Sequence, residues 1–293
     1  MPAHAEAWPV SHVFDPYAVN VLLWTDRLYF ELGAKRSSDS GLDLIYMDGH
    51  QRSPGGAVVW GVDRQCDEDH FHTMLLDAER EFQALGGRVM RVYMEDPVPL
   101  PLGKTLSRLG YHSRVELALM APLPLPSSAD PPDPCYTLRA VTTDEQWRIK
   151  QSLHAGASEQ PDGYDLSAAD WVELERQKCE TGGMQCYLVF SGDEPIAAVA
   201  LIRDRGVARL KNLYVASSHR KRGVGLTTIR LLANEAANLG YRRFGCFAVK
   251  GGNALRVYER AGLRIISSVT EFSKDLAQPA LPNKLKKPDH AAR

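Results

Sequence analysis

A proline-rich stretch in the middle of the chain most constrains how the chain can fold. Residues 121–134 read APLPLPSSADPPDP and include six prolines. Proline lacks a backbone N–H donor and fixes φ, so this stretch is expected to form an extended, semi-rigid connector outside any helix or sheet interior. We therefore expect one domain at 1–122, a linker at 123–134, a second domain at 135–278 and a disordered tail at 279–293, which is rich in proline and lysine.

The composition argues against several classes of protein. The chain of 293 residues has 35 Lys and Arg against 36 Asp and Glu, so its overall charge gives no reason to expect a nucleic-acid or membrane partner. The five cysteines are scattered, without a C-x-x-C pair or zinc-ligand spacing, and we expect reduced thiols, no metal and a cytoplasmic protein. The N-terminal residues lack the basic segment and apolar core of a signal peptide, and the apolar run 196–202 is far shorter than the roughly 20 residues of a membrane span.

Hydrophobic periodicity predicts an α+β order in the C-terminal half. Thr142 to Glu145 has the pattern of a helix start, with Glu145 placed for a capping box on Thr142, and a second helix is expected to begin after Ser167. Apolar positions spaced by three or four residues predict a helix that ends at Gly240. The other expected elements are strands at 136–141, 186–190, 196–202, 209–215, 244–249 and 263–272, and a short helix at 254–261.

The N-terminal half repeats part of this order. A helical pattern is followed by a strand at 89–93, and Arg108 to Tyr111 parallels Arg260 to Leu263. We interpret the repeat as a duplicated domain. At a constant offset of 154, Thr73, Glu81, Leu85, Gly86 and Arg88 match Thr227, Glu235, Leu239, Gly240 and Arg242.

The clearest chemical signal is the loop Arg220-Lys221-Arg222-Gly223-Val224-Gly225, which lies between a predicted strand and an amphipathic helix. The first turn of a helix has unpaired N–H groups and the positive end of the helix dipole. Glycine lets a ligand approach the backbone closely, and the basic side chains add positive charge. The loop therefore predicts a pyrophosphate site. Basic residues alone would fit a solvated turn or a targeting signal, but the glycines and the following helix favour the anion site.

This region resembles the coenzyme A signature of the GNAT superfamily of N-acyltransferases. The family motif is [R/Q]-x-x-G-x-[G/A] after a strand that ends in an apolar-Tyr-Val type of sequence, which here is Leu213-Tyr214-Val215. Downstream, Tyr258 to Leu263 resembles the family's closing Y-x-x-x-G-F element. The resemblance covers about residues 136–276 and extends only weakly to 14–121.

The resemblance implies a fold and an activity. Two tandem GNAT-like α+β domains are expected, each a mixed, mostly antiparallel sheet flanked by helices. Acetyl-CoA would be the co-substrate, and an acetyl or related acyl group would pass to a small-molecule or peptide amine by direct attack within a ternary complex. The amine, the acyl-chain preference and the oligomeric state stay open.

The resemblance also assigns roles to residues. Backbone N–H groups of the loop and of Leu226 would hold the pyrophosphate, and Leu213 to Val215 would hydrogen-bond the pantetheine arm and the thioester carbonyl. Tyr258 would protonate the departing thiolate, as a phenol with a pKa near 10 can do within hydrogen-bond reach. The alternative is that Tyr258 only packs in the core. The cofactor-binding set is Leu213, Tyr214, Val215, Arg220, Lys221, Arg222, Gly223, Val224, Gly225, Leu226 and Asn253.

Two features depart from the family pattern. Gly251 stands where the family often has Asn, so Asn253 is the substitute expected to cap the short helix and contact CoA. No strong general base is evident, because Lys211 and Asn212 stand where some relatives place a carboxylate. The remaining candidates for the base are Glu159, Asp162 and Asp165, which also fit an ordinary hydrophilic loop.

The N-terminal copy is expected to be inactive. The residues that align with the loop are Cys66 to Phe71, which include three carboxylates and no glycine, and carboxylates repel a diphosphate. Leu106 aligns with Tyr258, so the acid is missing as well. Two other functions stay open for the chain: a non-catalytic acyl-CoA sensor or regulatory subunit, and a tRNA-dependent aminoacyl transferase on a similar tandem fold.

Overall fold

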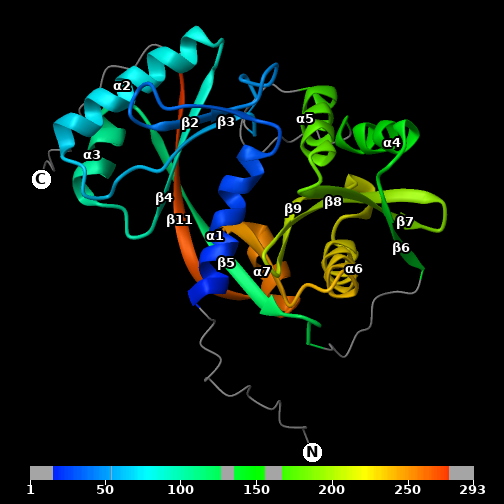
Figure 1. Cartoon of the computed structure of the whole chain (residues 1–293). Helices are drawn as coiled ribbons and strands as arrows, with labels where there is room; N and C mark the ends of the chain where they lie inside the picture. The colour runs from blue at the N-terminus through cyan, green and yellow to red at the C-terminus, as the bar shows by residue number, and fades with distance from the viewer. Residues whose placement is uncertain (1–15, 54, 127–134, 156–166, 277–293) are drawn as a thin grey trace, which may run out of the picture. The chain divides into compact units, whose positions relative to one another are not determined.

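The computed structural model describes residues 16–53, 55–126, 135–155 and 167–276 (Figure 1). The described chain forms two compact units. Unit 1 comprises the described residues of 16–29, 117–155 and 178–268, and unit 2 those of 30–116, 167–177 and 269–276. Each unit therefore contains residues from both sides of the predicted linker. The expected boundaries at 122 and 135 stay a prediction about the sequence repeat, and the predicted tail lies outside the described residues.

Helices and strands are interspersed along the chain (Figure 1). Up to the proline-rich stretch they are α1 Pro16–Glu31, β1 Lys35–Ser37, β2 Asp43–Tyr46, β3 Ala57–Trp60, α2 Glu68–Ala84, β4 Val89–Glu95, α3 Leu100–Arg108 and β5 His112–Pro122. After it they are β6 Tyr136–Ala140, α4 Asp144–Ala155, α5 Ala168–Glu180, β7 Met184–Ser191, β8 Glu194–Asp204, β9 Val207–Val215, the 3₁₀ turn η1 Ser217–His219, α6 Val224–Asn238, β10 Arg243–Val249, α7 Asn253–Arg260 and β11 Arg264–Asp275.

The strands form a mixed, mostly antiparallel arrangement. In unit 1 the order is β5-β10-β9-β8-β7-β6, and in unit 2 strands β1-β2-β3-β4-β11 follow one another. Strand β9 pairs with β10 in parallel and β3 pairs with β4 in parallel, whereas β4–β11, β6–β7, β7–β8 and β8–β9 are antiparallel. Each parallel pair is joined by a helix, α6 or α2, as a parallel connection requires. The predicted α+β fold, a mostly antiparallel sheet flanked by helices, is confirmed.

The core of unit 1 lies between its sheet and helix α6. Residues 196–202 of β8 are fully buried, which explains why this strand is a continuous apolar run. Ile229, Leu232, Ala233 and Ala236 form the buried stripe of α6 and pack with residues of β8, β9 and β10. The spacing of three to four residues that predicted this helix is therefore confirmed at these four positions, whereas Leu239, the last apolar position of the same spacing, is not buried. That residue is the C-cap and is 45% exposed, because it follows the last helical turn.

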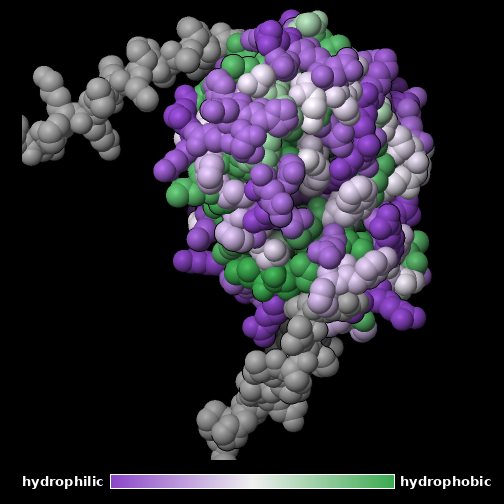
Figure 2. All heavy atoms as spheres, turned by 60° about the vertical axis from the view of Figure 1, so that its left-hand side comes forward, coloured by the Kyte–Doolittle hydropathy of each residue, from purple (hydrophilic) through white to green (hydrophobic). Residues whose placement is uncertain are grey.

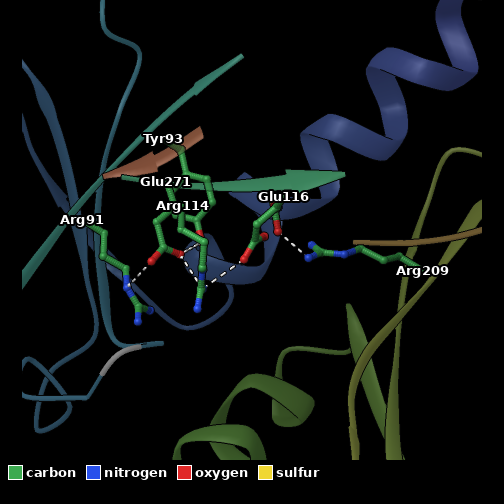
Figure 3. A network of polar contacts seen from close by, with 7 residues as sticks. Arg91, Tyr93, Arg114, Glu116, Arg209 and Glu271 are labelled. Atoms are coloured by element: carbon green, nitrogen blue, oxygen red, sulfur yellow. Dashed lines mark hydrogen bonds and ion pairs between the residues drawn. The ribbon is translucent and has the colours of Figure 1, made fainter. Parts of the chain in front are cut away.

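In unit 2 a buried carboxylate fixes strand β11. Glu271 is 3% exposed and accepts hydrogen bonds from the Tyr93 hydroxyl and from Arg114 Nη2, the latter at 3.2 Å. Arg91 Nε lies 3.5 Å from the other oxygen of the same carboxylate (Figure 3). Burying a carboxylate costs free energy unless charged and hydrogen-bonding partners compensate, so this network specifies the position of β11 beside β4.

One face of the described surface is mostly hydrophilic. On the face in Figure 2, hydrophilic residues cover most of the area, with hydrophobic residues between them. In the described part of the chain no helix is long and apolar enough to cross a membrane. Large hydrophobic side chains that are exposed include Tyr17, Trp24, Leu100, Val249 and Ile265.

The start of helix α4 differs from the prediction by one residue. Thr143 Oγ1 accepts from the Gln146 backbone N–H at 3.3 Å, and Gln146 Oε1 accepts from the Thr143 N–H at 3.0 Å. This reciprocal pair is a capping box, so the expected pair of Thr142 and Glu145 is wrong. Gln146, rather than Glu145, accepts from the backbone N–H at the helix start. Glu and Gln both fit this position of a capping box, so the sequence alone could not decide between these neighbouring residues.

The capping box makes a prediction for stability. Thr143→Ala should lower the free energy of unfolding by about 1 kcal/mol, the usual loss of an N-cap side chain. Thr142→Ala is the matched control and should cost clearly less, because the Thr142 hydroxyl donates to the Gln146 side chain at 3.2 Å and caps no helix N–H group among the described residues. Urea denaturation of both variants measures this difference. A larger loss in Thr142→Ala would contradict the observed register.

Candidate functional site

Strand β9 changes its register just before the predicted loop. Along β8, Ala198 pairs with Tyr214 and Ala200 pairs with Lys211, so β9 contains one extra residue between these pairs. Asn212 lies in this bulge with φ 53°, a left-handed conformation that is uncommon outside glycine but is tolerated by Asn. The bulge turns the end of β9, where the predicted residues Leu213 to Val215 are half-buried.

Strands β9 and β10 pair only at their beginnings. Their parallel ladder joins Val207 to Arg243, Ala208 to Phe244 and Arg209 to Gly245. In the part of the chain that the structure describes, this ladder does not continue to Leu213 and Val215. The end of β9 therefore has no strand partner among the described residues on the side that faces away from β8, where the Val215 carbonyl accepts a hydrogen bond from Arg220 Nε instead. Such an unpaired edge can bind an extended polar chain in the manner of an added strand.

The predicted anion loop leads directly into helix α6. Gly223 is the N-cap residue with φ 83° and ψ −8°, and no side chain caps the helix there. A Cβ built on Gly223 meets no described atom within 4 Å, so the space above the helix N-terminus is open. At Gly225 a Cβ would make only ordinary contacts, 4.0 Å from Val215 and from Val257. The first-turn N–H groups of α6 are thus accessible to an anion.

The three basic residues of the loop are exposed but differ in their contacts. Arg220 Nε donates to the Val215 carbonyl at 3.1 Å, and its guanidinium lies 5.6 Å from the centre of the Tyr214 ring. Arg220 therefore ties the loop to the end of β9. Lys221 is left-handed with φ 61°, and both Lys221 and Arg222 are exposed.

Hydrophobic packing brings several of the predicted residues together. Leu213 and Leu226 pack against the core cluster that contains Tyr258. Val215 packs against the neighbouring cluster that contains the buried Val224. The strand end, the loop and helix α7 are therefore held by two adjoining clusters of unit 1.

Tyr258 is deeply placed at the end of α7. Its side chain is only 7% exposed and belongs to the core of unit 1. Burial raises the pKa of Tyr258 well above its usual value; Cys246 raises it further, and the Arg209 guanidinium lowers it. The phenol therefore stays protonated at ordinary assay pH and can donate a hydrogen bond. The same raised pKa makes full proton transfer harder, and the burial also fits the core-packing alternative.

Asn253 does not have the expected capping position. Helix α7 begins at Asn253, and Gly252 is its N-cap without a side-chain hydrogen bond. The expectation that Asn253 caps the helix is therefore wrong, because the chain enters the helix one residue earlier. Its predicted contact with CoA stays a prediction.

The structure places other polar residues near the strand end that the sequence did not single out. The rings of His154 and Tyr214 are stacked with centroids 5.1 Å apart, and His154 Nε2 lies 3.0 Å from the buried Lys150 Nζ. Lys211 lies over the Tyr29 ring of α1 at 4.6 Å. Contacts between segments so distant in the chain leave no local sequence pattern. The base candidates Glu159, Asp162 and Asp165 lie outside the described residues.

The corresponding helix of the N-terminal half begins differently. Helix α2 follows the parallel strand β3, as α6 follows β9. Asp67 is its N-cap, and the Asp67 carboxylate accepts from the His70 backbone N–H at 2.9 Å. The chain thus places its own negative charge where an anionic ligand would bind. Val59 of β3 pairs with Val92 of β4 in the parallel ladder. The next residues along the two strands, Trp60 and Tyr93, stack with ring centroids 5.6 Å apart.

Three further observations concern possible ligand sites. Unit 2 has an open groove of about 890 Å³, lined partly by Lys104, Arg108 and Thr270, which contains none of the predicted site residues. Within the described ranges, no group of three or more His, Cys, Asp or Glu residues could hold a metal ion. All five cysteines are free thiols.

Comparison with known proteins identifies the domain that contains the loop. Residues 145–263 match the model of the Acetyltransferase (GNAT) family. No curated protein matches the sequence of the chain. Solved structures with a similar fold include a GCN5-related N-acetyltransferase from Kribbella flavida, with 16% identity, a TM-score of 0.62 and coverage of 88% of this chain and 95% of that chain. Another from Sphaerobacter thermophilus has 14% identity, a TM-score of 0.60 and coverage of 82% and 78%. A tandem GNAT protein from the clavulanic acid biosynthesis pathway has 12% identity, a TM-score of 0.53 and coverage of 81% and 79%.

These findings confirm the central part of the sequence interpretation. The chain contains a GNAT acetyltransferase domain, which is an acyltransferase domain, at residues 145–263. At these low identities the solved structures show a shared fold and nothing finer. The duplicated origin and degenerate state of the N-terminal half, and the role of each site residue, stay predictions.

The loop geometry predicts the effect of a side chain at Gly223. Gly223→Val should weaken acetyl-CoA binding by about 100-fold or more, because the side chain fills the space above two or more charge-assisted N–H contacts. The matched control is Gly240→Val at the other end of α6. Gly240 has φ 87° and an equally open surrounding, so valine there has the same backbone strain.

Calorimetry with acetyl-CoA and thermal denaturation of both variants separate the two effects. Both variants should lose similar stability, and only Gly223→Val should lose affinity. Equal affinity in the two folded variants would contradict the assignment of the loop.

Proposed function

We propose that this chain, with its GNAT acetyltransferase domain, transfers an acetyl or related acyl group from CoA to an amine by direct attack within a ternary complex. The observation that carries the proposal is the open N-terminus of helix α6. It is preceded by Gly223 in a left-handed conformation, lacks a side-chain cap, and follows a strand whose end is unpaired on one side. Together these features provide an anion site and an extended binding edge in one segment.

The loop and the strand end would bind the two parts of CoA. The N–H groups from Lys221 to Leu226, with the dipole of α6, would hold the pyrophosphate. The basic side chains of the loop would add screened, longer-range attraction. The backbone of Leu213 to Val215 would hydrogen-bond the pantetheine arm along the unpaired edge of β9. In this arrangement the thioester would lie beside the end of β9, at the edge from which β10 has separated.

Acyl transfer then needs a neutral amine and donors for the thioester oxygen. Attack by the amine nitrogen on the carbonyl carbon moves negative charge to that oxygen, which positioned backbone N–H groups of the strand end can stabilise. Collapse of the tetrahedral intermediate forms the amide and expels the CoA thiolate. The amine loses one proton in the process, and the thiolate gains one.

Tyr258 is our choice for the donor to the thiolate. It lies on α7, packs against the same cluster as Leu213 and Leu226, and stays protonated at assay pH. Its phenol would stabilise the thiolate by donating a hydrogen bond as negative charge grows on sulfur. A proton donor that acts only late in the reaction affects turnover far more than it affects binding of acetyl-CoA.

We propose one CoA site per chain. The N-terminal half repeats the order strand, helix, strand, helix, strand, with β3, α2, β4, α3 and β5 corresponding to β9, α6, β10, α7 and β11. Both helix-strand junctions after α3 and α7 contain a left-handed glycine, Gly110 with φ 87° and Gly262 with φ 96°. These likenesses support a tandem GNAT origin with a degenerate N-terminal domain at 1–122 and a catalytic domain at 135–278. The Asp67 cap on α2 opposes anion binding in the first copy.

Two rival functions make different predictions. An acyl-CoA sensor or regulatory subunit would bind acetyl-CoA but would release no thiol with any amine. An aminoacyl transferase that uses charged tRNA would not need the uncapped loop before α6. Thiol release with a panel of amino sugars, polyamines, amino acids and peptides is the experiment that tests acyl transfer, and it also selects the acceptor.

The role of Tyr258 predicts the outcome of two substitutions. Tyr258→Phe keeps the buried ring and removes the hydroxyl, so turnover should fall by about 10²- to 10⁴-fold while acetyl-CoA affinity changes little. Tyr258→Ala should also lower the free energy of unfolding, by about 3–5 kcal/mol, because it leaves a cavity in the core. Assays of thiol release measure the loss of turnover, and thermal denaturation measures the loss of stability. If Tyr258→Phe keeps more than half of the wild-type turnover, with chemistry rate-limiting, Tyr258 only packs the core.

A further inference from the structure

Two cysteine thiols of unit 1 lie in contact with each other. Cys179 is in the last turn of helix α5, and Cys186 is in strand β7, which follows α5 after a short turn (Figure 1). Their Sγ atoms are 3.7 Å apart, and both are free thiols. The sulfurs of a disulfide are about 2 Å apart, so a small movement of these two side chains would bring them to bonding distance.

Hydrogen bonds hold the backbone on both sides of this contact. The Cys179 carbonyl accepts from the Gly182 N–H at 3.0 Å, in a turn where Gly182 has φ 82°. The Gly182 carbonyl accepts from Arg203 Nη2 at 3.0 Å, which fastens the turn to β8. The Cys186 carbonyl accepts from the Val141 N–H at 2.8 Å. The fold therefore keeps the two thiols side by side, and joining them costs little further chain entropy.

The two thiols differ in their access to solvent. Cys186 is 0% exposed, whereas Cys179 is partly exposed. A small oxidant in solution can therefore reach Cys179 but not Cys186. An accessible cysteine beside a second thiol is the arrangement in which the first oxidation product is converted to a disulfide.

Two other cysteines of unit 1 show what exposure or burial does alone. Cys135, just before β6, is exposed. Cys246 of β10 is buried, and burial raises the pKa of its thiol well above the usual value, although the Arg209 guanidinium lowers it in part. Because the thiolate is the reactive form, Cys246 should react little in the folded chain.

We propose that Cys179 and Cys186 are a redox-active pair that low-molecular-weight disulfides convert to an intramolecular disulfide. The Cys179 thiolate attacks one sulfur of the small disulfide, which forms a mixed disulfide and releases one small thiol. The Cys186 thiolate then attacks Cys179 Sγ, which forms the protein disulfide and releases the second small thiol. The two cysteines are oxidised, the small disulfide is reduced, and the two cysteine protons end on the two released thiols.

In the oxidised chain this bond fastens the end of α5 to the sheet of unit 1. Lys178, the residue before Cys179, is buried and donates to the Tyr29 carbonyl at 2.7 Å. Lys211 Nζ of β9 lies 4.6 Å from the centre of the same Tyr29 ring. The fastened helix end thus contacts, through Tyr29, the strand that leads to the candidate site. Formation of the bond does not depend on the proposed acyl transfer.

Incubation of the full folded chain with glutathione disulfide tests the pair directly. After the remaining thiols are alkylated, cleavage at glutamate residues separates the two cysteines, because Glu180 lies between them. Without reduction, the peptides that contain Cys179 and Cys186 should stay joined, and a reductant should release them. The peptide that contains Cys135 should carry glutathione instead. Cys135→Ser is the matched control and should leave the amount of joined peptide unchanged.

Two further variants test the order of the steps, with thermal denaturation to show that each is folded. In Cys186→Ala, the mixed disulfide of Cys179 with glutathione should accumulate about tenfold or more above wild type, because the intramolecular attack that removes it is lost. In Cys179→Ser, the buried Cys186 should react as little as Cys246. The inference is wrong if wild-type Cys179 remains unmodified or bound to glutathione while Cys135 reacts, or if Cys186 in Cys179→Ser reacts as fast as Cys135.

Discussion

The separation of β9 from β10 after Arg209 and Gly245 is the constraint on which the candidate site depends. A parallel ladder that continued would occupy the backbone groups at the end of β9 and leave no edge for an extended ligand. On its other side β9 stays paired with β8, and the bulge at Asn212 changes the register there without ending the pairing. The strand end is therefore paired with a strand on one side only, and the turn η1 and the basic loop connect it to an uncapped helix N-terminus. The proposed anion site and the proposed binding edge both depend on this geometry.

The two halves share an order of helices and strands but differ in the residues at the start of the helix between the parallel strands. Helices α2 and α6 both connect parallel strands, and both end in a left-handed glycine, Gly86 or Gly240. Their first turns differ, because Asp67 caps α2 with a carboxylate whereas Gly223 leaves α6 open. Fold alone does not determine function. We therefore propose that the local chemistry of the helix start decides which half binds the anion.

The elements that could be predicted from the sequence are those whose signals lie between neighbouring residues of the chain. The apolar run of β8, the stripe on α6 and the glycine at its end predicted the core of unit 1 well, because burial and periodicity depend on neighbours along the chain. The capping box of α4 was misplaced by one residue, since Glu145 and Gln146 both fit the pattern. The buried ion pair of Asp26 in α1 with Arg209 in β9 and the stacking of His154 on Tyr214 could not be predicted, because each joins segments with no shared local pattern. The same limit applies to the compact units, which combine residues from both sides of the proline-rich stretch.

Hydrogen–deuterium exchange of the full chain, with and without CoA, tests the central claim most directly. The account predicts slower exchange on CoA binding in peptides that cover residues 210–226, where the unpaired edge of β9 and the first turn of α6 lie. Peptides that cover residues 60–71, at the start of α2, should exchange at the same rate in both states because the Asp67 carboxylate already caps that helix. Protection at 60–71, or unchanged exchange at 210–226 when CoA is bound, would contradict the account.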